Sequence, residues 1–413
     1  MPTTVSINDI RDAADRIADG VQRTPCFRSE WLSPLVGFDL YLKREHRQGT
    51  GSFKERGARS ALMLLSDAQK KQGVVSASAG NHALALASHG KQLGVPVTVV
   101  MPTFAPIIKV RNCEELGANI ILHGDHIGDC KDYANRLVEE QGLTYVNGYD
   151  DPGIIAGAGT IGLEMLEQVP GLDAIVVPVG GGGLIAGIGI AIKAIKQDIK
   201  LIGVEPESAA SFTAARQAGK PVKARVSPTL ADGLAVPCVG ENAYALAEPL
   251  IDKLITVTEP EIALAILRLA EMEKAVVEGA GASGVAAALA GKLDDYRGKR
   301  VATILCGGNI DTTMLGRIIQ RGMAVDGRLC RFSAHISDRP GGLNAFTKVL
   351  ADEGVSVIDI AHDRVFGGDE IASVSVECEV ETRNIEHIRQ LRDRLNDAGF
   401  DTKFHDLPKT CDA

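Results

Sequence analysis

Lys54 is the first residue whose position could support covalent chemistry. It lies in segment 50–57, TGSFKERG, where Ser52 and Glu55 have the spacing of a capping box. That spacing predicts a helix that begins here and carries Lys54 in its first turn. The first turn is the positive end of the helix dipole, which disfavours a cation. The amine could therefore have the lowered pKa that a Schiff-base lysine requires, although most lysines are simply solvated at the surface.

Two further segments each follow a run of β-branched or small residues and then open a helical pattern. Segment 76–82, SASAGNH, contains small residues that would let a ligand approach. The N–H groups of the following helix start could hold a carboxylate, although an ordinary strand-to-helix turn explains the segment equally well. Segment 180–183 consists of four glycines. Consecutive N–H groups without side chains suit a phosphate, and packing alone explains them poorly because each glycine reduces stability.

The glycine run also fits a different chemistry. Gly181, Gly183 and Ala186 match the spacing of a dinucleotide-binding fingerprint, and Glu205 lies where its ribose-binding acid would stand. A nicotinamide-dependent oxidoreductase is therefore an alternative, although it leaves segments 50–57 and 76–82 unexplained. Cys306 ends a further β-branched run, at the place where α/β proteins bind ligands. Taken alone, it is more typical of a buried structural thiol.

The overall composition narrows the classes of protein. The 413 residues include 45 glycines, whereas an average usage of about 7% would give roughly 29. A hydrophobic fraction of 45% excludes a disordered chain, and a net charge of −9 argues against nucleic-acid or anionic-membrane partners. The uncharged stretch 174–192 approaches membrane-spanning length, but its proline and glycines favour strand, loop and helix. Eight cysteines without a C-x-x-C pair, and no secretory signal, predict a reduced, cytoplasmic protein.

The elements that must position these residues alternate in type between residues 70 and 310. Continuous apolar strands separated by helices predict parallel sheets covered on both faces, and the strands group into two sheets on either side of residues 147–152. The expected strands are 74–77, 96–100, 119–122, 175–179, 201–204 and 301–305.

The pattern changes near Asp326. Val374, Val376, Cys378 and Val380 alternate with polar residues, as in a half-exposed antiparallel strand. The tail reads as strand, helix, strand, strand, helix, strand, which predicts a small ferredoxin-like α+β domain. The corresponding ranges are 328–336, 342–353, 355–362, 371–380, 384–398 and 400–405.

Together these segments resemble the pyridoxal-phosphate enzymes of fold type II, and most closely the threonine dehydratases (threonine ammonia-lyases). The tail, with DRPGGL at 338–343, is similar to an ACT domain, so the chain resembles the medium-length form. The resemblance implies a catalytic domain over 1–325, with a small subdomain at about 49–150, and an ACT-like regulatory domain over 326–413. The matching stretches lie at 48–58, 78–82, 101–110, 159–164, 180–183, 277–282 and 307–311.

The resemblance also assigns roles to single residues. Lys54 would hold the cofactor as a Schiff base and then remove the α-proton of the substrate. Asn81 would face the 3-hydroxyl oxygen of pyridoxal 5'-phosphate, and Cys306, where many relatives have serine, would face its pyridine nitrogen. The other cofactor-binding residues would be Phe53, Gly180, Gly181, Gly182 and Gly183. The substrate would be bound by Ser78, Ala79, Gly80, Asn81 and His82.

The implied reaction is β-elimination and deamination of L-threonine, and of L-serine, to 2-oxobutanoate or pyruvate and ammonia. Serine racemases typically carry a second serine where Ala79 stands. Its absence here favours elimination over racemisation. Dehydration of a 3-hydroxyaspartate and residual racemisation stay open as alternatives. Ser211 replaces the second carboxylate with which some members bind a divalent cation beside Glu205, so we expect no metal.

Regulation and assembly are implied by the resemblance alone. An amino-acid effector, a branched-chain one, would bind near a turn of the ACT-like domain, between paired domains, and we expect a homo-oligomer, either dimer or tetramer. The effector residues would be Arg339, Gly341, Gly342 and Leu343.

Overall fold

The computed structural model describes residues 4–363 and 373–405, and the chain divides between Asp311 and Thr312 into two compact units. We call them the N-terminal unit and the C-terminal unit. Helix α14 (Thr312–Val325) belongs to the C-terminal unit, although the sequence suggested that the second domain starts only after it.

The larger sheet of the N-terminal unit has six strands in the order β1-β2-β10-β7-β8-β9, of which only β1 is antiparallel to its neighbour. Its central strand β7 is buried at every position, as expected of a strand covered on both faces. The strands are β1 (Cys26–Arg28), β2 (Asp39–Lys43), β10 (Arg300–Ile304), β7 (Ala174–Pro178), β8 (Lys200–Pro206) and β9 (Lys253–Val257).

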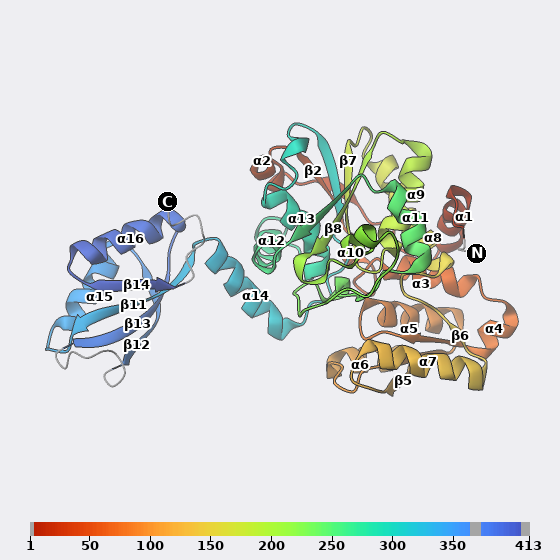
Figure 1. The fold of residues 1–413 in the computed structure, drawn as a ribbon, viewed down its shortest axis with the longest axis horizontal. Helices are drawn as coiled ribbons and strands as arrows, with labels where there is room; N and C mark the ends of the chain where they lie inside the picture. Colours follow the sequence, from red (N-terminus) through yellow and green to blue (C-terminus); the bar gives the residue numbers. More distant parts are fainter. Residues whose placement is uncertain (1–3, 364–372, 406–413) are drawn as a thin grey trace. The chain divides into compact units, whose positions relative to one another are not determined.

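The smaller sheet has four parallel strands in the order β5-β4-β3-β6, so the prediction of two parallel sheets is confirmed. Its strands are β5 (Asn119–Leu122), β4 (Val97–Met101), β3 (Val74–Ala77) and β6 (Thr144–Tyr145). It forms one lobe of the N-terminal unit together with α5 (Asn81–Leu93), α6 (Ile107–Glu115) and α7 (Ile127–Gln141) (Figure 1).

Helices α8 (Pro152–Gln168) and α9 (Gly183–Ile195) pack so closely that their contact needs glycine. A Cβ on Gly187 would lie 2.3 Å from the Ile155 carbonyl oxygen, so part of the glycine surplus serves backbone packing. The remaining helices are α1 (Ile7–Ile17), α2 (Leu32–Val36), α3 (Lys54–Met63), α4 (Asp67–Gln72), α10 (Ser211–Ala218), α11 (Glu241–Ala247), α12 (Glu259–Met272) and α13 (Gly279–Leu289).

The uncharged stretch 174–192 forms strand β7, the glycine loop and most of helix α9. Among the residues that the structure describes, no helix combines the length and apolar character needed to cross a membrane.

Besides α14, the described part of the C-terminal unit contains an antiparallel sheet in the order β12-β13-β11-β14 with helices α15 and α16, which confirms the predicted ferredoxin-like α+β arrangement. One face of the sheet packs on an apolar core that includes Phe332, Phe346 and Leu391. The elements are β11 (Leu329–Ser337), α15 (Gly342–Asp352), β12 (Ser356–Asp363), β13 (Ser373–Glu381), α16 (Ile385–Asp397) and β14 (Asp401–His405).

Candidate active site

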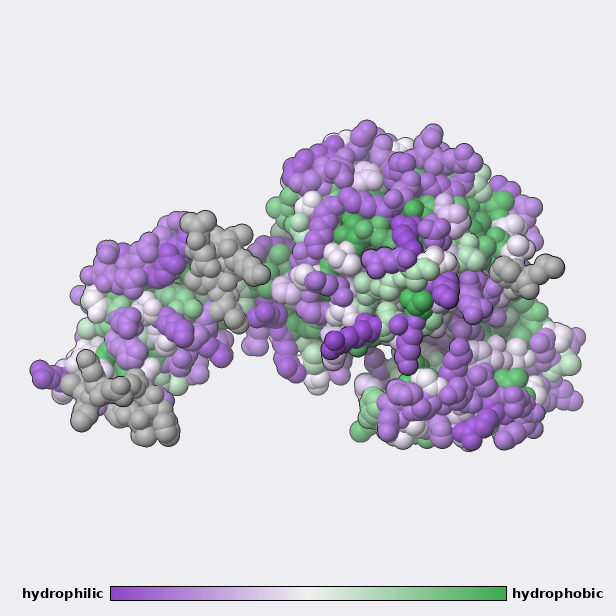
Figure 2. Space-filling model, in the orientation of Figure 1, coloured by the Kyte–Doolittle hydropathy of each residue, from purple (hydrophilic) through white to green (hydrophobic). Residues whose placement is uncertain are grey.

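A cavity of about 550 Å³ lies in the N-terminal unit, next to the carboxyl ends of β3, β7 and β10. Figure 2 shows a hollow between the lobe with the smaller sheet and the lobe with the larger one. The structure brings every predicted cofactor and substrate residue to this cavity: Phe53, Lys54, Ser78, Ala79, Gly80, Asn81, His82, Gly180, Gly181, Gly182, Gly183 and Cys306.

Helix α3 begins at Lys54, but the predicted capping box is wrong. The cap residue is Phe53, which makes no side-chain capping bond. The Glu55 carboxylate instead accepts the backbone N–H of Thr50. The Ser52 hydroxyl is buried and has no partner among the described residues. The spacing of Ser52 and Glu55 therefore predicted the correct helix start, but the capping bonds on which that prediction rested are not formed.

Main-chain bonds to the end of strand β10 hold this turn. The Phe53 N–H donates to the Cys306 carbonyl oxygen at 3.0 Å, and the Gly308 N–H donates to the Gly51 carbonyl oxygen at 2.9 Å. These bonds fix Lys54 and Cys306 relative to each other, although they are 252 positions apart in the sequence (306 minus 54).

The amine of Lys54 lies inside the cavity. Its Nζ donates to the Gly148 carbonyl oxygen at 2.5 Å. Burial lowers the pKa of Lys54 to about 8, against weaker opposite effects of Cys306 and Glu278. Burial disfavours the ammonium form, and an amine must lose its proton to act as a nucleophile or base.

The four glycines form a loop of free N–H groups at the start of α9. Among the described residues, none of the N–H groups of Gly180–Gly183 donates a hydrogen bond. Gly182 has a φ of 94°, a left-handed conformation that favours glycine. A Cβ on Gly183 would lie 2.2 Å from the Tyr149 carbonyl oxygen. The loop therefore fits a phosphate at the N-terminus of a 13-residue helix.

The segment around Asn81 brings further backbone N–H groups to the cavity. Gly80 precedes the first residue of α5, and the N–H groups of Asn81 and His82 have no acceptor in the described part of the chain. Burial, and then the charge of Lys54, lower the pKa of His82 to about 3. The imidazole is therefore neutral, and the backbone N–H groups, not a histidine cation, are suited to hold a carboxylate.

Cys306 and Glu205 have different environments. Burial, followed by the charge of Glu278, raises the pKa of the Cys306 thiol well above its ordinary value, so the thiol is neutral. Glu205 accepts hydrogen bonds from the Phe212 N–H at 2.6 Å and from Thr213. That carboxylate is occupied in holding the start of α10 and is not placed as a ribose-binding acid.

The described residues contain no cluster of three or more metal-ligating acids, histidines or cysteines.

Glu278 lines the cavity but received no role from the sequence. Its side chain is only 5% exposed, and its carboxylate accepts the Asn81 side-chain N–H at 2.7 Å. Burial, reinforced by the charge of Asp232, raises the pKa of Glu278 to about 7. A single acid within the run 276–282, VVEGAGA, was the available signal.

The predicted effector turn lies in the C-terminal unit, between β11 and α15. Gly341 has a φ of 101°, and a Cβ on Gly342 would lie 2.0 Å from the Ser337 carbonyl oxygen. The turn therefore requires both glycines.

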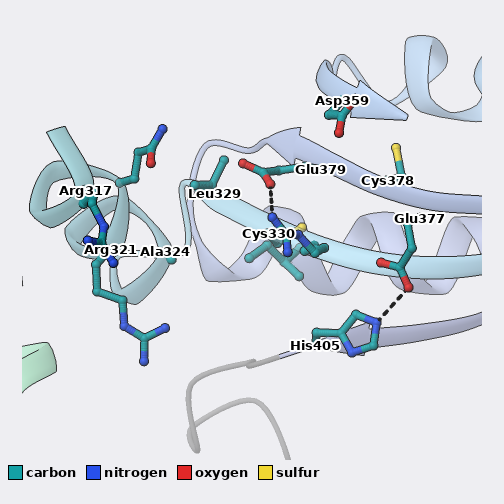
Figure 3. Close-up of a pocket in the computed structure, with 13 residues that line it drawn as sticks. Arg317, Arg321, Ala324, Leu329, Cys330, Asp359, Glu377, Cys378, Glu379 and His405 are labelled. Atoms are coloured by element: carbon teal, nitrogen blue, oxygen red, sulfur yellow. Dashed lines mark hydrogen bonds and ion pairs between the residues drawn. The ribbon is translucent and has the colours of Figure 1, made fainter. Parts of the chain in front are cut away.

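This unit also has a cavity of about 840 Å³, which the effector turn does not line. Figure 3 shows Arg317 and Arg321 of α14 on one side of it, and Glu377, paired with His405, on the sheet. The predicted effector residues and this cavity are therefore separate features.

Comparisons with known proteins identify the family of the chain. The profile of the family "Pyridoxal-phosphate dependent enzyme" matches residues 17–307. The L-threonine ammonia-lyase of Thermotoga maritima is 41% identical over 97% of this chain and 99% of its own. Threonine deaminase isoform 2 from Solanum lycopersicum has a TM-score of 0.72 and 36% identity over 78% of this chain and 95% of its own. Maize serine racemase has a TM-score of 0.73 and 36% identity over 76% and 97%.

The chain therefore belongs to the pyridoxal-phosphate-dependent enzymes of fold type II and, within them, to the threonine dehydratase (threonine ammonia-lyase) family. It is an ammonia-lyase that uses pyridoxal 5'-phosphate, and the nicotinamide alternative is excluded. The free glycine N–H groups and the buried amine of Lys54 fit this cofactor's phosphate and aldehyde.

Proposed function

We propose that the enzyme converts L-threonine to 2-oxobutanoate and ammonia by β-elimination, and L-serine to pyruvate by the same route. The observation that carries the proposal is the arrangement of the Lys54 amine, the four-glycine loop and the start of helix α5 around one cavity. The likeness to L-threonine ammonia-lyases supports threonine as substrate. The cofactor, when bound, supplies the electron withdrawal that makes the α-proton of an amino acid acidic.

The residues of the chain divide the remaining tasks. Gly180–Gly183 hold the phosphate with their N–H groups, and the segment 78–82 holds the substrate carboxylate. Lys54 first anchors the cofactor and then accepts the α-proton at Nζ, which its lowered pKa allows. Cys306 offers the pyridine nitrogen a neutral thiol, a weaker partner than a carboxylate, because burial keeps that thiol protonated.

Ala79 is the residue that favours elimination over racemisation in this proposal. A racemase needs an acid on the face of the cofactor opposite the lysine, and Ala79 has no side-chain proton to give. We therefore expect elimination to dominate, although maize serine racemase has a similar fold. A 3-hydroxyaspartate is the other substrate to compare.

The test combines a substrate panel with a lysine substitution. The wild-type enzyme should be yellow and release a 2-oxo acid from threonine and serine, in preference to 3-hydroxyaspartate and without inverting serine. In Lys54→Ala we expect no borohydride-trapped cofactor and a rate lower by about 10²- to 10⁴-fold, as for loss of a general base. Lys200→Ala, which removes an exposed lysine paired with Asp252, is the matched control. A Lys54→Ala enzyme that deaminates threonine at the control rate would overturn the proposal.

The C-terminal unit is proposed to be an ACT-like regulatory domain that binds a branched-chain amino acid at the turn 339–343, in a homo-oligomer. The ferredoxin-like topology and the two required glycines of the turn support this assignment. Arg339→Ala and Leu343→Ala should weaken the response of the activity to isoleucine or valine. Lys348→Ala, on the same unit outside the turn, should respond as the wild type does. An unchanged response in both turn variants would contradict the assignment.

The free thiols of the seven described cysteines support a cytoplasmic location.

A further inference from the structure

The side-chain amide of Asn81 is held from both ends. Its Nδ2 donates to Glu278 Oε1 at 2.7 Å, and its Oδ1 accepts the side-chain N–H of Asn309 at 2.8 Å. The same Asn309 nitrogen also donates to the Thr50 carbonyl oxygen at 2.7 Å. Asn81 therefore receives one partner from the start of α13 and one from the loop after β10, while it stands at the start of α5.

These two partners select one orientation of the amide. An asparagine side chain can be turned so that oxygen and nitrogen exchange places. The Asn309 amide nitrogen donates only to oxygen, and Glu278 in its carboxylate form accepts only from N–H. A reversed Asn81 would set its oxygen against the Glu278 carboxylate and its nitrogen against the Asn309 nitrogen, which loses both bonds.

The fixed orientation leaves one N–H of Asn81 available. The Nδ2 atom carries two hydrogens, and only the bond to Glu278 uses one of them among the described residues. Asn81 lines the cavity together with Lys54 and Cys306. A free N–H there donates to an oxygen of whatever the cavity holds, and a reversed amide would offer that oxygen a lone pair.

The chain makes room for the Glu278–Asn81 pair at Gly307. A Cβ on Gly307 would lie 2.1 Å from Glu278 Oε1 and 3.0 Å from Asn81 Nδ2. Gly307 is not left-handed, so its backbone conformation does not require glycine. Space for the pair is therefore the reason that glycine stands at 307.

We propose that Glu278 is a positioning residue which, together with Asn309, holds Asn81 as a hydrogen-bond donor to the 3-hydroxyl oxygen of the cofactor. Glu278 acts through Asn81 and does not itself touch the reacting atoms. The inference rests on the proposed function, because it takes the cofactor-binding role of Asn81 from there.

The test is a double-mutant cycle on the binding of pyridoxal 5'-phosphate to the apoenzyme. Asn81→Ala should weaken binding about 10- to 100-fold, the range for a hydrogen bond to a charged group, and should shift the visible absorption band of the holoenzyme. Glu278→Gln should shift the band in the same direction and weaken binding about tenfold. The double variant should bind no more weakly than Asn81→Ala alone, since the two residues act on one bond.

Two further variants serve as controls that distinguish loss of the Glu278–Asn81 contact from loss of folding. Glu205→Gln neutralises another buried carboxylate, outside the cavity, and should leave the band and the affinity unchanged. Gly307→Ala keeps the Glu278 and Asn81 side chains but displaces the pair, and should reproduce the band shift of Glu278→Gln.

The possible failures are distinguishable. If Glu278→Gln has the wild-type band and affinity, or if its effect adds in full to that of Asn81→Ala, the positioning role is wrong while the proposed function stands. If the wild-type protein takes up cofactor but does not release a 2-oxo acid from threonine, the proposed function fails, and the cycle still reports on the Asn81 contact.

Discussion

The two units of the chain place their charged side chains differently. The N-terminal unit encloses Arg56, Lys43 and Glu45 at no more than 1% exposure. In the described part of the C-terminal unit, the only buried polar residues are Thr382 and His387, and the rest of its core is apolar. The difference shows two ways of holding elements together: by paired charges from distant parts of the sequence, and by alternation of apolar and polar residues along neighbouring strands.

The buried charges surround the helix that carries Lys54. Arg56 makes two bonds to Glu45, both at 2.8 Å, and two to Glu164, at 2.7 and 2.9 Å. Lys43, at the end of β2, donates to the same Glu164. Strand β2, helix α3 and helix α8 thus share one network, and its geometry fixes where Lys54 enters the cavity.

The largest effect is expected from breaking this network. Arg56→Met removes a buried cation and leaves Glu45 without its main partner, so the free energy of unfolding should fall by about 3–5 kcal/mol. Urea unfolding of the apoenzyme followed by circular dichroism measures the change. Arg23→Met breaks an exposed pair with Glu167 and should cost less than about 1 kcal/mol. Equal stability of both variants would mean that the buried charge network holds the N-terminal unit together no better than an exposed ion pair does.

In the C-terminal unit, a comparable loss of stability should follow from a change in the apolar core, with no charged residue involved. Phe332 is fully buried and stacks on Phe404 with ring centroids 4.6 Å apart. Phe332→Ala should destabilise the C-terminal unit by about 3–5 kcal/mol. Hydrogen exchange resolved by peptide should show lost protection in strands β11 and β13. Phe27→Ala, at an aromatic that is 62% exposed, is the control, and protection of β11 should be unchanged there.

The smallest effect concerns the pH dependence of the N-terminal unit. Burial raises the pKa of Glu278 from 4.5 to about 7, so the folded form binds its proton more tightly than the unfolded form. Its contribution to stability is complete below pH 4.5 and is lost as the pH rises through 7. The groups that act on the pKa of Glu278 are Lys54, Cys306, Asp232, Lys109, the Asn81 side chain and the backbone N–H of Asn309.

The apoenzyme variant Glu278→Gln should therefore gain stability relative to the wild type as the pH rises over that window. Urea unfolding of both proteins at the two ends of the window measures the difference. A gap that stays constant with pH would mean that Glu278 keeps an ordinary pKa in the folded protein. It would also weaken the contrast with the C-terminal unit.

The contrast also explains what the sequence could predict. In the C-terminal unit, alternation at Val374, Val376, Cys378 and Val380 marks the buried face directly, and all six predicted elements are present, although residues 371–372 of the strand predicted at 371–380 lie outside the described residues. In the N-terminal unit, the β-branched strands β3, β5 and β7 were also identified. Strands β1, β2, β6 and β9 were not predicted; β1 and β6, with three and two residues, are too short to show a pattern.

The candidate site shows the same limit. Lys54, the glycine loop and Cys306 lie in short motifs, and the structure brings them to one cavity. The partners that hold them lie far away in the sequence. Glu278 is 197 positions from Asn81, and Glu164 is 121 positions from Lys43. Nothing in a local pattern specifies such a pair, because its geometry exists only once the sheets have formed.

The strand order of the larger sheet has a consequence for how the chain folds during synthesis. The smaller sheet is complete once Tyr145 has left the ribosome, since all its strands lie between residues 74 and 145. Strand β2 must wait for β10, whose last residue is Ile304, before it gains its parallel neighbour. Throughout that interval an early strand has an unpaired edge. Residues 26–43, which contain β1 and β2, are thus exposed to aggregation through this edge while the rest of the unit is being made.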